Sequence, residues 1–434
     1  MKTVLKNGTI LTMETAQAEL IHGDIGIEGE TIVFIGEQPA DFRADLELDA
    51  QGGIVMPGLV DAHTHIAMSL MRHYADDLPF WSWLFERILP VEENLIDEHV
   101  YHGSRLSLVE LIRSGVTTFA DMYSNMDAVA QATLESGLRA NLTRGLMFNG
   151  PEDLVKLEEG RRFYKDWNGK GGGRLQVDVG PHAVYTIPPE YMLKVAELAK
   201  ELNTRIHIHL SESRKEVDDC LQAHGKTPIA HARDQGLFEC KTYGAHCVHI
   251  TDEDIRILQE SGVSVINNPT SNLKLGNGFA PVTKLLEAGV NVALGTDGSA
   301  SNNNLNMFEE THLAALVNKG VTEDPTTVSA YTALQMATIN GARALGLEET
   351  TGSLKVGKKA DIIVIDIEAP HFYPRHSVSA GLVYAAQSSD VKTVICNGEV
   401  VMQDRQLTQL DEQEIYRKAQ ASAAAITGNK EFMP

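Results

Sequence analysis

Residues 57–65 read PGLVDAHTH, a short apolar run that ends in two histidines, His63 and His65. In a β-strand, residues two positions apart point to the same side, so both imidazoles would share one face. Apolar strands that end in polar residues are typical of folds in which parallel strands alternate with helices, because the chemistry of such folds lies at the carboxyl ends of the strands. We therefore predict that this stretch ends the first strand of a parallel sheet.

The same alternation of short apolar runs with amphipathic stretches continues through most of the chain, and this pattern predicts repeated strand–helix units. We count eight candidate strands, at residues 54–62, 116–122, 140–146, 176–180, 205–210, 241–248, 263–267 and 291–295. Eight such units that close into a ring form a (β/α)₈ barrel. The predicted fold is therefore an α/β, TIM-like barrel.

The two ends of the chain have a different pattern. Residues 9–12, 24–27 and 31–35 are short β-branched runs with Asn-Gly and Gly-Glu turns between them, which predicts antiparallel hairpins. Similar runs return at 361–365 and 392–401, so we expect the termini to meet in one small β-sandwich domain. The predicted division is 1–56 and 351–410 for this β domain, 57–350 for the barrel, and 411–434 for a C-terminal helix and tail.

Charge and cysteine content exclude several classes of protein. Lysine and arginine number 37 against 59 acidic residues, a net charge of −22 that repels nucleic acid and anionic membrane surfaces. The four cysteines form no C-x-x-C pair, which indicates a reducing, cytoplasmic setting and no disulfide framework. No stretch approaches the roughly 20 apolar residues that span a bilayer. The sequence shows no interface pattern, so whether the protein forms a homo-oligomer is left open.

Polar residues at other strand ends add to the histidine pair. Alone, an H-x-H pair is weak evidence, since histidines also serve as hydrogen-bonded groups near a core. His209 ends the fifth candidate strand and Asp297 ends the eighth, so three imidazoles and one carboxylate can converge. Such donors, with room for water and no cysteine at these ends, are typical of a catalytic metal site. His207 has the parity of His209 but lies one layer deeper, where we expect a core or supporting role.

Several stretches make the chain resemble a known family. PGLVDAHTH, His209, His246 and the Thr-Asp-Gly motif at 296–298 resemble the amidohydrolase superfamily, and specifically its branch of one-metal deaminases. Five further stretches look like the 5-methylthioadenosine/S-adenosylhomocysteine deaminases within it, at residues 77–84, 89–92, 180–186, 209–212 and 268–275. The resemblance covers nearly the whole chain and includes the flanking β domain.

This resemblance implies a set of metal ligands. His63, His65, His209 and Asp297 match the ligand positions of the family. Members with two metal ions bridge them with a carboxylated lysine at the end of the fourth strand, where this chain has Pro181-His182 instead. We therefore expect one divalent ion. Zn²⁺ is the first choice, and Fe²⁺ and Mn²⁺ suit the same donors.

The resemblance also implies catalytic roles for three side chains. Asp297 would accept a proton from the attacking water, and His246 would orient and stabilise the resulting hydroxide. Glu212 would protonate the ring nitrogen of the substrate, which requires burial to raise its pKa. The alternatives are that Glu212 is a solvated loop carboxylate and that His246 is a turn residue packed under a helix.

The expected substrate is a small nucleoside. Glu92 would bind ribose hydroxyls, and His182 and Arg144 would contact the substrate together with Glu212 and Asp297. Trp81 and Trp83 could stack on the substrate or pack a lid against the barrel. The predicted reaction is hydrolytic deamination of 5-methylthioadenosine or S-adenosylhomocysteine, with release of ammonia. The alternatives are another heterocycle (guanine, a cytosine-like pyrimidine or a triazine) and a catalytically inactive, scaffold-like relative.

Overall fold

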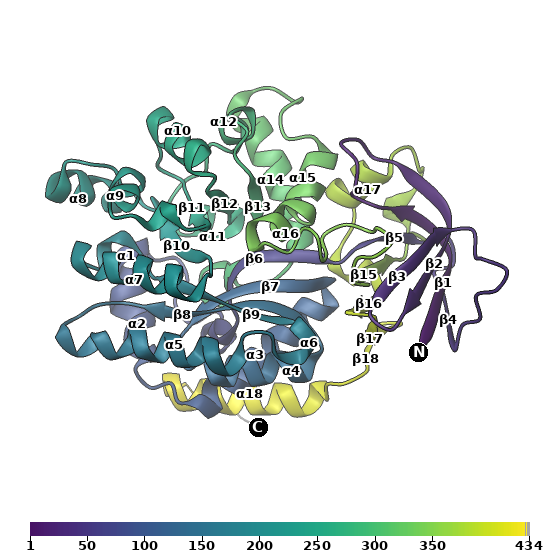
Figure 1. Ribbon diagram of the computed structural model, residues 1–434, viewed down its shortest axis with the longest axis horizontal. Helices are drawn as coiled ribbons and strands as arrows, with labels where there is room; N and C mark the ends of the chain where they lie inside the picture. Colours follow the sequence, from purple (N-terminus) through teal and green to yellow (C-terminus); the bar gives the residue numbers. More distant parts are fainter. Residues whose placement is uncertain (430, 432–434) are drawn as a thin grey trace.

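A computed structural model describes residues 1–429 and 431, so the end of the predicted tail lies outside the described residues. The molecule has a barrel of strands surrounded by helices and a smaller β domain at one end, where the N-terminal strands lie beside strands from the end of the chain (Figure 1). Both features confirm the predicted architecture. None of the described helices is long and apolar enough to cross a membrane.

The barrel consists of parallel strands that pair in sequence order. The last strand is interrupted: its first part, β13, pairs with β12, and its second part, β14, pairs with β6 and closes the ring. The strands are β6 (Leu59–His65), β7 (Val116–Tyr123), β8 (Arg139–Leu146), β9 (Leu175–Pro181), β10 (Ile206–Leu210), β11 (Thr242–His246), β12 (Ser264–Asn267), β13 (Val292–Leu294) and β14 (Asp297–Gly298).

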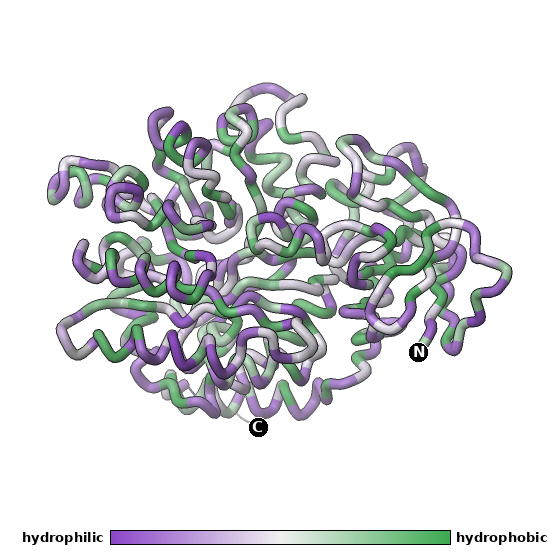
Figure 2. The backbone as a smooth tube through the Cα atoms, in the orientation of Figure 1, coloured by the Kyte–Doolittle hydropathy of each residue, from purple (hydrophilic) through white to green (hydrophobic). Residues whose placement is uncertain are grey.

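Amphipathic helices surround these strands. Figure 2 shows apolar positions along the strands and alternating polar and apolar positions along many of the outer helices, as expected where one face of a helix packs against the barrel. The longer helices are α3 (Asp97–Arg113), α4 (Met126–Ser136), α5 (Val155–Trp167), α7 (Pro189–Leu202), α8 (Arg214–His224), α10 (Asp252–Ser261), α14 (Met307–Thr322) and α18 (Glu412–Thr427). The shorter ones include α9 (Pro228–Asp234), α12 (Val282–Glu287), α15 (Ala330–Met336), α16 (Ile339–Leu345) and α17 (Val378–Tyr384).

The β domain joins strands from both ends of the chain in one sheet. β1, β2 and β3 pair antiparallel, as the hairpin pattern predicts, and β15 pairs antiparallel with β5 to connect the two ends. The strands are β1 (Lys2–Leu11), β2 (Leu20–Glu28), β3 (Thr31–Gly36), β4 (Leu46–Asp49), β5 (Ile54–Pro57), β15 (Ile362–Ile365), β16 (Val391–Cys396), β17 (Glu399–Gln403) and β18 (Gln406–Leu407).

The first predicted strand, residues 54–62, is divided between the two sheets. β5 belongs to the β domain and β6 to the barrel, with Gly58 between them. A Cβ atom at Gly58 would lie 2.1 Å from Thr117 Oγ1, so only glycine allows this close approach to β7. The apolar pattern alone conceals the break because both halves are buried.

A buried ion pair links the barrel to the β domain. Arg139 Nε, at the start of β8, donates to Asp361 Oδ2 at 3.0 Å, and Arg139 Nη2 donates to Asn397 Oδ1 at 3.0 Å. The Arg139 and Asp361 side chains are only 2% and 0% exposed. Burial alone would raise the pKa of Asp361, but the adjacent guanidinium outweighs it and lowers this pKa below its usual value.

We expect Asp361→Asn to destabilise the protein by about 3–5 kcal/mol, because the substitution leaves the Arg139 charge buried without its partner. The contribution of the ion pair is present above the unfolded pKa of the carboxyl and is lost as pH falls through the lower folded value. Denaturant titration at pH 7 measures the loss. The control is Asp166→Asn, which breaks an exposed pair with Arg162 and should have a much smaller effect. Equal losses in both variants would contradict the prediction.

Candidate active site and metal centre

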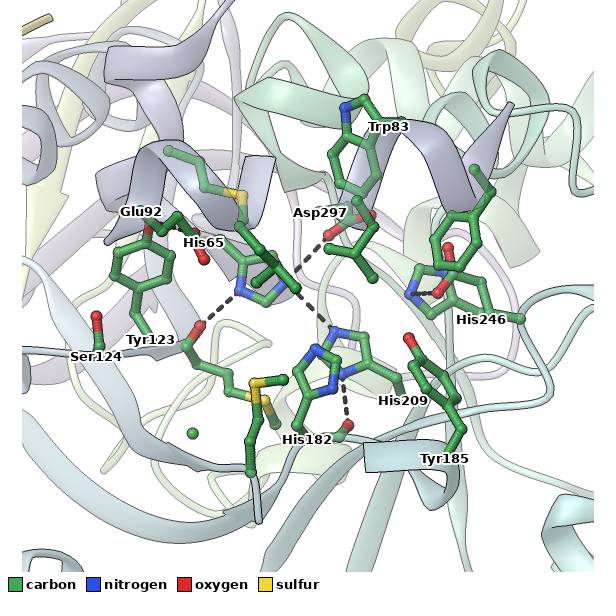
Figure 3. A pocket seen from close by; sticks show the side chains of 18 of the residues that line it. His65, Trp83, Glu92, Tyr123, Ser124, His182, Tyr185, His209, His246 and Asp297 are labelled. Carbon is green, nitrogen blue, oxygen red and sulfur yellow. Dashed lines mark hydrogen bonds and ion pairs between the residues drawn. The ribbon is translucent and has the colours of Figure 1, made fainter. Parts of the chain in front are cut away.

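The four predicted metal ligands lie together at the carboxyl ends of three barrel strands. Figure 3 labels three of them, His65, His209 and Asp297. Asp297 Oδ1, on β14, lies 3.4 Å from His63 Nε2 and 3.2 Å from His65 Nε2, both on β6. His209 Nε2, on β10, lies 3.4 Å from His65 Nε2. These separations match the edge of a tetrahedron whose metal–ligand bonds are about 2.0–2.1 Å long.

The hydrogen bonds at the Nδ1 atoms of His65 and His209 test whether the four side chains fit a metal ion. His65 Nδ1 lies 2.6 Å from the Met122 carbonyl oxygen, and His209 Nδ1 lies 2.7 Å from that of His182. A carbonyl only accepts, so each Nδ1 carries the proton and, in the neutral ring, each Nε2 carries a lone pair. Two lone pairs that face each other at 3.4 Å repel, so a proton or a metal ion must lie between them. The donors therefore fit a divalent metal ion.

His63 has support from the layer below it. Its Nδ1 lies 2.7 Å from His207 Nε2, while its Nε2 is buried and has no hydrogen-bond partner among the described residues. The ring of His207 stacks on Tyr243 with centroids 4.4 Å apart. His207 thus lies where the strand parity predicts, behind a metal-site histidine instead of beside the ion.

Protons compete with a metal at this site. Burial alone would lower the pKa of His65, but the carboxylate of Asp297 raises it to about 9. A metal must displace this proton before it can bind to Nε2, so metal affinity falls as the pH falls. In contrast, burial and the neighbouring imidazoles hold the pKa of His209 well below its usual value, which keeps this ring neutral.

Glu212 is a buried carboxyl group, not a solvated loop residue. Its side chain is 5% exposed, and Oε2 lies 3.7 Å from His246 Nε2. Burial raises the pKa of Glu212 well above its usual value, and the charges of Asp297 and Glu216 raise it further. The arrangement favours the protonated acid near neutral pH, as a proton donor requires.

The turn that carries Glu212 is held by a second carboxylate. Glu216 accepts hydrogen bonds from the backbone nitrogens of Ser211, at 3.0 Å, and Glu212, at 2.7 Å. Ser211 has a φ of 50°, in the left-handed region that non-glycine residues seldom adopt. These two bonds compensate for the strained turn and point Glu212 into the pocket.

The predicted substrate residues line one pocket together with His65, His209 and His246. Figure 3 labels Glu92, His182 and Asp297 among them. Tyr123 Oη donates to Glu92 Oε1 at 2.5 Å, which leaves Glu92 Oε2 for a ligand. His182 lies beside His209, and Arg144 lies at the pocket's edge, where Nη2 also donates to Glu159 at 3.1 Å. All five expected contacts face the same cavity: Glu92, His182, Arg144, Glu212 and Asp297.

Most of the apolar wall was not predicted from the sequence. A cover consisting of α1 (Phe80–Ser82), η2 (Trp83–Ile88) and α2 (Leu89–Glu92) contributes to this wall. Apolar residues on separate helices and strands carry no sequence signal for a shared pocket, since the same residues serve equally in a core. The unpredicted lining residues are Met68, Phe80, Leu84, Leu89, Met122, Tyr123, Ser124, Gly145, Met147 and Tyr185.

The two tryptophans of the cover differ in position. Trp83 lines the pocket, and its Nε1 donates to the Ala300 carbonyl at 3.2 Å. Trp81 does not line the pocket: it stacks on Phe85 with centroids 5.3 Å apart and packs against Tyr185 at 5.2 Å. Packing of the cover thus accounts for Trp81, whereas Trp83 can also touch a ligand.

Comparison with known proteins agrees with this geometry. The model of the amidohydrolase family matches residues 54–401. The chain belongs to this family. A curated amidohydrolase relative, the 5-methylthioadenosine/S-adenosylhomocysteine deaminase of Thermoanaerobacter pseudethanolicus, is 52% identical over 417 residues, which cover 96% of this chain and 97% of the relative.

Solved structures of similar proteins agree over nearly the whole chain. An adenosine deaminase from Xanthomonas campestris with bound zinc has a TM-score of 0.93 at 33% identity, covering 98% of this chain and 99% of that one. An atrazine chlorohydrolase from Arthrobacter aurescens, complexed with zinc, has a TM-score of 0.90 at 25% identity, covering 97% and 100%. The resemblance predicted from the motifs is confirmed, and this amidohydrolase has a cluster of histidine and aspartate that fits a divalent metal.

Proposed function

We propose that this amidohydrolase is a hydrolytic deaminase of adenosine-type nucleosides, with 5-methylthioadenosine and S-adenosylhomocysteine as the preferred class. Water adds to the ring carbon that bears the amino group, the C–N bond breaks, the carbon becomes a ring carbonyl, and ammonia leaves. The observation that carries the proposal is a buried carboxyl with a raised pKa, Glu212, in one pocket with four histidines and Asp297. The names of the curated relatives support the substrate class.

Each polar side chain has a step that its surroundings support. Glu212 protonates the ring nitrogen next to the attacked carbon. Asp297, whose carboxylate stays ionised, accepts a proton from the attacking water, and His246 orients that water. His63, His65, His209 and Asp297 would hold the metal, whose role is to make the attacking water more acidic.

We propose Zn²⁺ as the resident ion. Three imidazoles and a carboxylate without a thiolate suit a catalytic zinc site, and a similar solved deaminase contains zinc. Metal analysis of the purified protein tests this choice. About one zinc per chain is the expected result, and a protein that holds iron or manganese instead, and is active with it, would contradict the choice.

A panel of substrates tests the function. Ammonia release is measured with 5-methylthioadenosine, S-adenosylhomocysteine, adenosine, guanine, cytosine and a triazine. We expect the adenosine derivatives to be turned over with the highest kcat/KM. Activity on guanine, cytosine or triazines with none on adenosine derivatives would favour the alternative heterocycle, and a metal-loaded protein without any activity would favour an inactive relative.

Glu92 should distinguish nucleosides from free bases. We expect Glu92→Gln to lower kcat/KM for 5-methylthioadenosine about 10- to 100-fold, because a charge-assisted hydrogen bond to a ribose hydroxyl contributes about 1.5–3 kcal/mol. The loss should appear mainly in KM, since the ribose is remote from the reacting carbon. Any residual turnover of adenine, which has no ribose, should be unchanged. An equal loss on adenine would contradict the assignment.

A further inference from the structure

We propose that the segment from Asn268 to Asn277, which follows β12 and includes α11 (Pro269–Lys274), is a positioning element for all three catalytic side chains. Three side chains of this segment each hydrogen-bond a different catalytic residue: Ser271, Asn272 and Asn277. The inference rests on the proposed function and deepens it, because it assigns the residues that determine which catalytic atoms carry protons.

Ser271 fixes the orientation of Asp297. Its Oγ donates to Asp297 Oδ2 at 2.6 Å, and Ser301 donates to the same oxygen at 3.0 Å. The other oxygen, Oδ1, accepts from the Gly298 backbone nitrogen at 2.9 Å and lies 3.2 Å from His65 Nε2. The hydroxyl groups therefore occupy one oxygen and leave the other for the metal and the water.

Asn272 selects the tautomer of His246. Its Oδ1 lies 2.8 Å from His246 Nδ1, closer than Asn268 Nδ2 at 3.3 Å. An amide oxygen only accepts, so Nδ1 carries the proton and Nε2 has a lone pair toward the pocket. Asn272 Nδ2 is buried and has no partner among the described residues, so the bond from His246 to Oδ1 is the side-chain hydrogen bond that Asn272 makes there.

Asn277 determines which oxygen of Glu212 carries the acid proton. Its Nδ2 donates to Glu212 Oε1 at 3.0 Å, and an N–H group requires an oxygen that bears no proton there. The acid proton is then on Oε2, which lies 3.7 Å from His246 Nε2. A proton donor and a proton acceptor thus face the same space, where the water and the ring nitrogen react.

The segment is rigid enough for this role. The Asn277 backbone nitrogen donates to the Asn272 carbonyl at 2.9 Å, and Lys274 Nζ donates to Asp76 at 2.6 Å. Asn272 and Asn277 are 1% and 7% exposed. The segment reaches three strands: Glu212 lies just beyond the end of β10, His246 ends β11, and Asp297 begins β14.

The test is the same isosteric change at two positions, N272D and N277D. At 272 the carboxylate still accepts from His246, whereas at 277 the donor to Glu212 is lost and a like charge takes its place. We expect kcat of N277D to fall about 10- to 100-fold with KM nearly unchanged, and kcat of N272D to fall only a few-fold. If both side chains only filled space, the two variants would behave alike.

A third variant, N318D, is the control for a buried charge. Asn318 lies on α14 and donates to the Ala314 carbonyl at 2.8 Å, outside the pocket, so kcat should be unaffected. Metal content is measured in every variant. Equal losses of kcat in N272D and N277D, or wild-type kcat in N277D, would overturn the inference. If the wild type acts only on another heterocycle, the proposed nucleoside function is wrong, and N272D and N277D are compared on that heterocycle instead. A wild type without any activity would overturn both the proposed function and this inference.

Discussion

Glu212→Gln should retain the metal and lose about 10²- to 10⁴-fold in kcat, the range that a general acid contributes. Glutamine preserves the shape of the side chain and can still accept from Asn277 through Oε1, but it has no acid proton to give to the ring nitrogen. Steady-state kinetics with 5-methylthioadenosine and metal analysis of the same sample measure the two effects. A variant with turnover near wild type would disprove the proton-donor role.

The pH dependence gives an independent test of the same residue. The pKa of Glu212 is raised by burial and by the neighbouring carboxylates. If Glu212 is the proton donor, only its protonated form supports turnover. Activity should therefore be present below this raised pKa and be lost as pH rises through it. In Glu212→Gln the residual activity should lack this alkaline limb. A limb that persists unchanged in the variant would belong to another group.

His209→Ala should lower metal content and activity together. The loss of activity should exceed about 10- to 100-fold, which is the effect of changing a residue that only hydrogen-bonds a metal ligand. The substitution removes one of the nitrogen donors and leaves His65 Nε2 without the neighbour that completes the site. Metal analysis and kinetics on the same preparation measure both quantities. Excess zinc should restore part of the activity if weakened binding is the cause.

A matched control separates this effect from the loss of any histidine. His224 is exposed near the end of α8 and lies outside the pocket, so His224→Ala should retain metal and activity. Full metal content in His209→Ala, with or without activity, would mean that His209 is not a ligand. Activity lost at full metal content would instead place His209 among the substrate contacts.

Local sequence features were sufficient for the barrel and for the types of residue in its site. The period of a strand places His63 and His65 on one face, and a histidine or an aspartate at a strand end has few roles in a parallel barrel except at its mouth. Glu212 could be predicted because its spacing from His209 places it just beyond the same strand. These inferences hold because each depends on residues that are close together in the chain.

The tertiary structure decided the contacts between distant segments. His65 and His209 are 144 positions apart, and their 3.4 Å separation depends on the register of the strands between them. The pairing of Glu92 with Tyr123 likewise depends on how the cover folds over the barrel.

Asparagine and serine side chains show most clearly which contacts the sequence alone does not predict. The stretch that contains Asn272 and Asn277 could be read only as a family motif, because such residues cap helices, form turns or bind ligands with equal ease. Their partners and that of Ser271 lie on or just after three other strands, so only packing selects one role for each. The sequence by itself thus determined which strand ends carry the chemistry, and the tertiary structure determined which atoms meet there, since strand periodicity is local and hydrogen bonds between strand ends are not.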